Sequence, residues 1–231
     1  LNDEELFYKL GINLVKEKIY DEALIYFNKL LEIKPNNAEI LSNIANIYYE
    51  KGNYINSIKY FKEAIQLKPD DYELYNDIGN AYYDNEDFKT AADYFKMAIK
   101  LNPDYPEAYN NLGNSLTELN ELDNAILCIN KALELKPFFP EAYNNLGHAY
   151  RYKHDYTRAE EYFVKAINLN PNYAKAYSNL GGIYLNMNML NDAIYYRKKA
   201  VEINPDDPEL HFNLSIAYLL NCDFVNGWKE Y

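Results

Sequence analysis

Asparagine side chains recur at a regular 34-residue spacing along the chain. Asn111, Asn145, Asn179 and Asn213 are each 34 residues apart, and Asn43 lies two such intervals before Asn111. A side-chain amide has an acceptor oxygen and two donor hydrogens, so it can bond both the N–H and the C=O of an extended backbone. Amides at a fixed interval therefore indicate recognition of a peptide main chain.

Few residues suit catalysis or metal binding. The three histidines, His148, His154 and His211, fall at unrelated places in the 34-residue spacing, and none has a Cys or carboxylate at metal-ligand spacing on its own helix. The sequence has no phosphate-binding glycine loop and no nucleophile elbow. We therefore expect a chain that is not an enzyme and that carries no metal and no cofactor.

The elements that position these amides repeat with the same period. All nine prolines fall in two columns of it, which are Pro35, Pro69, Pro103, Pro137, Pro171 and Pro205, and Pro106, Pro140 and Pro208. Such self-similarity is typical of a stacked array of small units. Counting from Glu4, the repeats are 4–37, 38–71, 72–105, 106–139, 140–173 and 174–207, with a partial repeat at 208–231. We expect a single array over residues 1–231.

Apolar residues predict two helices in every repeat. Positions 4, 7, 8 and 11 form the apolar stripe of one helix, and positions 20, 24 and 27 repeat that spacing in a second. We expect the helices near positions 1–14 and 17–30, with proline at position 32 ending the second one. Five of the eight glycines occupy position 8. Glycine inside a helix costs about 1 kcal/mol relative to alanine, which predicts that a neighbouring helix approaches closely there.

These columns resemble the tetratricopeptide repeat. The full pattern stands in the third repeat, at Tyr75, Ile78, Gly79, Tyr82, Ala91, Phe95, Ala98 and Pro103. The resemblance covers essentially the whole chain. It implies an all-α fold, a right-handed superhelical solenoid of antiparallel helix pairs, in which the first helices line a concave groove that holds other proteins.

In that family the groove is lined chiefly by positions 2, 5, 6, 9, 12 and 13 of the first helix. The expected peptide-binding residues are therefore Asn43, Asp77, Asn111, Asn145, Asn179 and Asn213 at position 6, Asn46, Asn80, Asn114 and His148 at position 9, and Asn76, Asn110 and Asn144 at position 5. We expect these side chains to lie outside the core. The alternative is a compositional bias, because asparagine makes up 32 of the 231 residues. Chance would place about one asparagine in a seven-member column, and asparagine is a middling helix former, yet position 6 holds five.

Two segments carry a finer resemblance. Residues 110–114 and 144–148 look like parts of the tetratricopeptide arm of protein O-linked N-acetylglucosamine transferases, where an asparagine ladder holds the substrate backbone. The last five residues, 227–231, resemble the end of the repeat region in bacterial proteins that carry a glycosyltransferase domain next. The chain is thus expected to be either a non-catalytic scaffold for extended protein segments or the substrate-recognition arm of a larger glycosyltransferase, and the parent sequence beyond Tyr231 would distinguish them.

Charge narrows the partners. With 35 acidic and 23 basic residues the net charge is -12, which disfavours nucleic acid and anionic membranes. Position 2 is Glu in six repeats and Lys175 in the remaining one, so the carboxylate clamp of chaperone-binding tetratricopeptide domains is not expected. This column favours basic or neutral ligands, or it simply complements the helix dipole.

Both ends of the sequence look incomplete. The chain begins with Leu and ends within the second helix of the partial repeat, so we expect that the natural N-terminus is missing and that more chain follows. We expect a cytoplasmic protein. Leu214, Tyr218 and Phe224 would then lack a covering repeat, which predicts self-association through this end, whereas Trp228 is expected to pack within its own hairpin.

Overall fold

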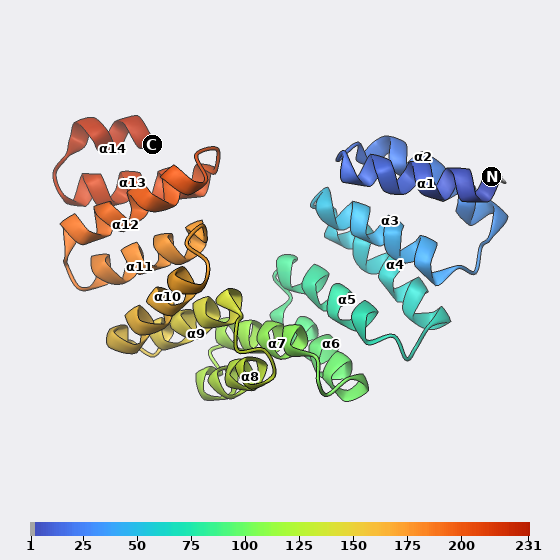
Figure 1. Cartoon of the computed structure of the whole chain (residues 1–231), viewed down its shortest axis with the longest axis horizontal. Coiled ribbons are helices and arrows are strands. Elements are labelled where there is room, and N and C mark those ends of the chain that lie inside the picture. The colour runs from blue at the N-terminus through green and yellow to red at the C-terminus, as the bar shows by residue number, and fades with distance from the viewer. Residues whose placement is uncertain (1–2) are drawn as a thin grey trace. The chain divides into compact units, whose positions relative to one another are not determined.

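The computed structural model describes residues 3–231, which leaves the first two residues of the expected array outside it. Over this range the chain forms fourteen α-helices and no strand (Figure 1). The first helices of successive hairpins are α1 (Asp3–Lys16), α3 (Ala38–Glu50), α5 (Tyr72–Asp84), α7 (Pro106–Glu118), α9 (Pro140–Tyr152), α11 (Ala174–Asn186) and α13 (Pro208–Leu220). The second helices are α2 (Tyr20–Ile33), α4 (Tyr54–Leu67), α6 (Phe88–Leu101), α8 (Leu122–Leu135), α10 (Tyr156–Leu169), α12 (Leu190–Ile203) and α14 (Phe224–Glu230). The predicted all-α fold of helix pairs is confirmed.

The helices form two compact units, Leu1–Ser115 and Leu116–Tyr231. In the first unit α3 packs on α4, and α4 packs on α5. In the second unit α9, α10, α11, α12 and α13 pack on one another in the same sequential way. Each helix therefore contacts chiefly its neighbours along the chain, as in a solenoid.

Polar residues set the beginnings of many helices. The side chains of Asn37, Asp71 and Asp207 accept hydrogen bonds from backbone N–H groups in the first turns of α3, α5 and α13. Such caps satisfy backbone donors that have no partner within the helix. Pro140 and Pro208 occupy the first helical positions of α9 and α13, where a missing N–H costs nothing.

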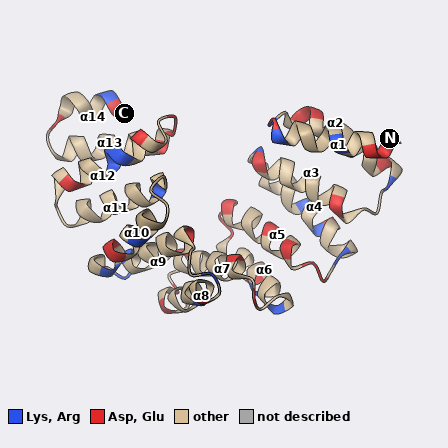
Figure 2. Ribbon diagram, viewed as in Figure 1, with Lys and Arg blue, Asp and Glu red and all other residues tan. Residues whose placement is uncertain are grey.

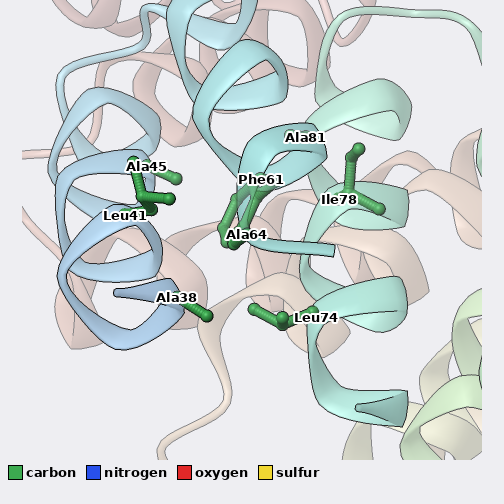
Figure 3. Packing of buried hydrophobic residues seen from close by; sticks show 8 residues of the cluster. All are labelled: Ala38, Leu41, Ala45, Phe61, Ala64, Leu74, Ile78 and Ala81. Carbon is green, nitrogen blue, oxygen red and sulfur yellow. The ribbon is translucent and has the colours of Figure 1, made fainter. Parts of the chain in front are cut away.

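The core of the first unit shows how the apolar stripes meet. Phe61 and Ala64 of α4 lie between Leu41 of α3 and Ile78 of α5 (Figure 3). Phe61 is 1% exposed and Ile78 is fully buried. One second helix thus joins two first helices through a single apolar layer.

Gly11, Gly79 and Gly147 of position 8 face phenylalanine rings, whereas Gly181 faces the side chain of Arg197. A Cβ atom on Gly79 would lie 2.5 Å from the Phe95 ring, and one on Gly147 would lie 2.8 Å from the Phe163 ring. These rings come from the second helix of the same hairpin. The predicted close approach is confirmed at these positions, and the group that makes it is the side chain of the second helix: phenylalanine in three hairpins and Arg197 in the sixth.

The hairpin turns share one backbone conformation. Lys18, Gly52, Glu86, Asn120, His154, Asn188 and Cys222 are 34 residues apart and have φ between +57° and +70°. This left-handed region is uncommon for residues other than glycine and asparagine. The backbone of the turn therefore keeps the same conformation in all seven hairpins, although six different residue types occupy this position.

Candidate peptide-binding surface

The position-6 side chains lie on the first helices, one in each repeat. Asn43, Asp77 and Asn111 belong to α3, α5 and α7 in the first unit, whereas Asn145, Asn179 and Asn213 belong to α9, α11 and α13 in the second. All six are partly exposed. Within each unit they form a row of polar groups, in which the Nδ2 atom of Asn43 is buried and has no hydrogen-bond partner.

Several of these amides already bond one another. In the first unit Asn111 Nδ2 donates to Asn76 Oδ1 and to Asn80 Oδ1, each at 3.0 Å. In the second unit Asn179 Nδ2 donates to Asn144 Oδ1 at 2.9 Å. The same bond, from position 6 of one repeat to position 5 of the preceding repeat, therefore occurs in both units.

The position-5 asparagines lie in the interior, contrary to our expectation that they lie outside the core. Asn76 and Asn110 are 5% exposed, and Asn144 is 1% exposed. Asn110 Nδ2 donates to Asn111 Oδ1 at 3.3 Å, and Asn144 Nδ2 lies 3.5 Å from Asn145 Oδ1. These buried amides orient the position-6 side chains. The structure therefore gives them a supporting role.

Position 9 is more varied. Asn46 is exposed, whereas Asn80, Asn114 and His148 are half-buried. Burial, together with the positive charge of Arg151, lowers the pKa of His148 to about 4. His148 is consequently neutral at pH 7, and its Nε2 lies 2.6 Å from Arg151 Nη2.

A pocket lies between successive first helices in each unit. In the second unit it has a volume of about 360 Å³ and includes Asn179 and Asn213. Tyr173 and Ser178 also line it, and neither was among the predicted site residues. Ser178 occupies position 5, so its small polar side chain was the one signal in the sequence. In the first unit the corresponding pocket has a volume of about 140 Å³ and includes Asn43 and Asp77.

The two pockets differ in charge. The first-unit pocket has four carboxylates and one lysine, namely Glu39, Asp71, Glu73, Asp77 and Lys68. Acidic residues are marked red on α3 and α5 in Figure 2. Burial raises the pKa of Asp77 to about 6, and Glu73 and Asp71 add to this shift, while a hydrogen bond from Asn76 opposes it. The second-unit pocket contains Lys175 with Asp207 and Glu209, so it is closer to neutral.

The C-terminal hairpin corrects two predictions. Leu214 is 2% exposed and Tyr218 is 7% exposed, so neither lacks cover. They lie at positions 7 and 11, and those positions face their own hairpin. Phe224 is 57% exposed as expected. Trp228 is 64% exposed, and its ring centroid lies 5.6 Å from that of Tyr231, so most of its surface faces solvent and is not packed within the hairpin.

Other kinds of site find no support in the described part of the chain. Residues 3–231 contain no group of three or more His, Cys, Asp or Glu side chains arranged for a metal ion. None of the helices described has the length and apolar character needed to cross a bilayer.

Comparison with known families decides the classification. Models described as tetratricopeptide repeat match residues 4–37, 36–104, 76–140, 140–173 and 174–207. The chain belongs to the tetratricopeptide repeat family. Proteins of this family are typically protein-interaction scaffolds.

Solved tetratricopeptide structures resemble the chain. A crystal structure of MamA is 31% identical, with a TM-score of 0.62, and the match covers 71% of this chain and 96% of MamA. A tetratricopeptide repeat protein from Parabacteroides merdae is 15% identical, with a TM-score of 0.83, and the match covers 100% of this chain and 91% of that protein's chain.

A chain of the APC/C hetero-tetramer Cut9-Hcn1 is 22% identical, with a TM-score of 0.76 and 91% of this chain covered. The match spans only 42% of that chain's length. The Parabacteroides merdae and Cut9-Hcn1 structures are less than 25% identical to the chain, so these two similarities show the fold alone. No curated protein matches the chain.

Proposed function

We propose that the chain is a non-catalytic scaffold that binds extended protein segments along the first-helix surface of each unit. The observation that carries this proposal is the pocket between α11 and α13, where Asn179 and Asn213 stand one repeat apart. The Asn213 amide makes no hydrogen bond to any other residue in the range 3–231, so both its donor and its acceptor are available to a ligand.

The spacing suits a main chain. Packed helices lie about 10 Å apart, which is the length of about three extended residues. A peptide that crosses the first helices would therefore meet one position-6 side chain for about every three of its residues. Five of the seven position-6 side chains are amides, the exceptions being Lys9 and Asp77. A side-chain amide can bond the backbone of a ligand and tolerates different ligand side chains.

The charge of the first-unit pocket narrows its ligand. Its four carboxylates are opposed by one lysine, which favours a segment carrying Lys or Arg. On the same reasoning, the part of a segment that occupies the second-unit pocket at Asn179 and Asn213 should be neutral, because the acidic and basic residues of that pocket are nearly balanced.

The experiment uses a peptide selected from a neutral library against the full chain. Asn213→Ala should weaken binding about 2- to 10-fold, because one net hydrogen bond contributes roughly 0.5–1.5 kcal/mol. Asn191→Ala, an exposed asparagine on the second helix α12, is the matched control and should bind like the parent. Isothermal titration calorimetry gives both affinities. If the two variants bind equally well, the position-6 asparagines are not the binding site.

The alternative, the substrate-recognition arm of a larger glycosyltransferase, would use the same surface. The two differ in the domain attached, so the parent coding sequence beyond Tyr231 separates them. In both cases residues 1–231 should not turn over a sugar nucleotide, and measurable hydrolysis or transfer by this chain would contradict the non-catalytic assignment.

A further inference from the structure

Two of the three arginines in the chain meet at one glycine of the second unit. Arg151 belongs to α9, Arg197 to α12 and Gly182 to α11. A Cβ atom on Gly182 would lie 3.9 Å from Arg151 Nη1 and 3.9 Å from Arg197 Nη2. The third arginine, Arg158, is exposed on α10. Two guanidinium groups on different helices therefore border the same open position.

Packing does not require a glycine there. A Cβ on the preceding residue, Gly181, would lie 2.7 Å from Arg197 Cγ, so that glycine is needed for space. On Gly182 the nearest atoms beyond its chain neighbours and the backbone of its own helix would be those two arginine nitrogens at 3.9 Å. Alanine would fit and would favour the helix. Gly182 thus leaves open a space that a side chain fills at position 9 in other repeats, as Asn80 and His148 do.

Arg197 is a buried cation without a counter-ion. It is 8% exposed, and burial lowers its pKa to about 10. Its Nη1 donates to the carbonyl oxygen of Asn213, and its buried Nε has no acceptor. No carboxylate among residues 3–231 pairs with it. An unpaired buried charge is costly, and four other hairpins place phenylalanine here, namely Phe27, Phe61, Phe95 and Phe163.

Arg151 likewise forms no ion pair with a carboxylate among residues 3–231. Its Nη2 meets His148 Nε2, and its guanidinium lies 5.6 Å from the centre of the Tyr152 ring. The carboxylate of Glu118 approaches the other nitrogen of the imidazole, with its Oε1 4.0 Å from His148 Nδ1. Lys175 is close enough for its charge to oppose protonation of His148. The pair of arginines therefore creates a local positive field in a chain whose net charge is -12.

We propose that the second unit binds an oxyanion, a phosphate or a carboxylate, over Gly182 between Arg151 and Arg197. Both guanidinium groups present N–H donors in a planar fork that suits such anions, and charge-assisted bonds of this kind are among the strongest in proteins. Because Gly182 lies at position 9 of a first helix, the anion reaches the surface proposed for peptide binding. If the oxyanion belongs to a bound protein segment, this inference rests on the proposed function. The segment would then carry an acidic or phosphorylated side chain at this place.

This site differs from what position 2 suggested. The glutamate column favours basic or neutral ligands, and the sequence offers Lys175 as its one exception. The arginines stand at positions 12 and 24 of neighbouring repeats, on α9 and α12. An anion bound there would supply Arg197 with the negative charge that no carboxylate among residues 3–231 supplies.

The test uses the full chain and three variants. Arg197→Phe restores the residue found in the other hairpins, and replacing a buried charge by a well-packed apolar group is often neutral or stabilising. Gly182→Asp places an internal carboxylate between the two arginines. Arg158→Gln removes an exposed arginine elsewhere and is the matched control for net charge.

Two probes distinguish the source of the anion. Inorganic phosphate is titrated at constant ionic strength, and a library-selected peptide is compared in its serine and phosphoserine forms. The parent and Arg158→Gln should bind the probe about 10-fold or more tightly than Arg197→Phe and Gly182→Asp do, because a hydrogen bond to a charged group contributes roughly 1.5–3 kcal/mol. A preference for the phosphoserine form assigns the anion to the peptide, and binding of phosphate alone assigns it to a free anion.

Equal binding of every probe by the parent, Arg197→Phe and Gly182→Asp would overturn the site. Gly182→Asp covers the case in which Arg197→Phe fails to fold. The serine peptide separates this result from a failure of the proposed function. If the parent and both variants bind the serine peptide alike and also bind the phosphoserine peptide and phosphate alike, the peptide surface stands and the oxyanion site is refuted. If Asn213→Ala binds the serine peptide as well as the parent does, the proposed function fails, and this result does not involve the side chain of either arginine.

Discussion

The hydrogen bond between Asn179 and Asn144 should make one alanine substitution in the asparagine column costly. Asn144 is 1% exposed, and its Oδ1 accepts from Asn179 Nδ2 at 2.9 Å. Replacing Asn179 by alanine strands this oxygen in the interior. Replacing Asn213 by alanine removes an amide that bonds nothing in the described residues. Two members of one column should therefore respond differently to the same change.

The magnitude follows from burial. An intact bond contributes roughly 0.5–1.5 kcal/mol, whereas a buried acceptor left without a donor costs about 1–3 kcal/mol. We expect Asn179→Ala to lower the free energy of unfolding by about 1–3 kcal/mol, and Asn213→Ala by less than about 0.5 kcal/mol. Asn144→Ala removes the acceptor itself, and the Asn179 donor that remains is half-buried and can reach water. The double variant should therefore show a coupling energy of about 1 kcal/mol.

Urea unfolding followed by far-ultraviolet circular dichroism measures these differences. Because a solenoid can open locally, amide hydrogen exchange of α9 and α11 provides a second readout that is specific to the contact between these two first helices, the seam between their repeats. Equal stability of Asn179→Ala and Asn213→Ala, or additive effects of Asn144→Ala and Asn179→Ala, would refute the reasoning. In that case the amide pair would contribute nothing to holding the repeats together.

Four further predictions concern other parts of the chain. Burial raises the pKa of Asp77 to about 6, so Asp77→Asn should stabilise the chain at pH 7 by at most about 3 kcal/mol, with the gain lost as the pH falls from 6 to below 4; equal urea midpoints at pH 7 would contradict this. Burial, with a neighbouring arginine, lowers the pKa of His148 to about 4, so the folded state resists protonation and the parent should lose stability as the pH falls from about 6.5 toward 4. His148→Asn should reduce this loss, and a variant with the same pH profile of stability as the parent would disprove the prediction. Gly147→Leu should lower the melting temperature, because even its Cβ would lie 2.8 Å from a phenylalanine ring, whereas Gly182→Ala, with 3.9 Å of clearance, should raise stability by up to about 1 kcal/mol; calorimetry showing the same sign for both would be inconsistent with this account. Trp228, 64% exposed, should support dimers at high concentration, and light scattering should show the parent, but not Trp228→Glu, to self-associate; a parent that stays monomeric rules this out.

The repeat and its helices could be predicted because each column reports one local constraint. Leu, small and aromatic residues at fixed intervals specify the stripe between the two helices of a hairpin, and the glycine column specifies a close approach. Gly79 against Phe95 is the direct outcome of that pattern. The constraint lies within a single repeat, so the sequence of one repeat contains it.

Contacts between repeats were harder to predict. Asn144 occupies position 5, which the hairpin stripe leaves free, yet the seam between first helices buries it. The amide character of positions 5 and 6 does not reveal which amide faces the seam and which faces solvent. Arg197 and Gly182 are 15 residues apart on different helices, so only the folded hairpin brings them together.

The left-handed turn residues give the chain a built-in comparison series. Lys, Gly, Glu, Asn, His and Cys occupy equivalent turns at nearly the same φ, between +57° and +70°. For a residue other than glycine this conformation costs roughly 1–2 kcal/mol, so the fold accepts that cost at Lys18, Glu86, His154 and Cys222. Because the hairpin imposes the conformation, these turns tolerate sequence drift, and a label or an affinity handle attached at Cys222 would report on the array while leaving its packing columns untouched.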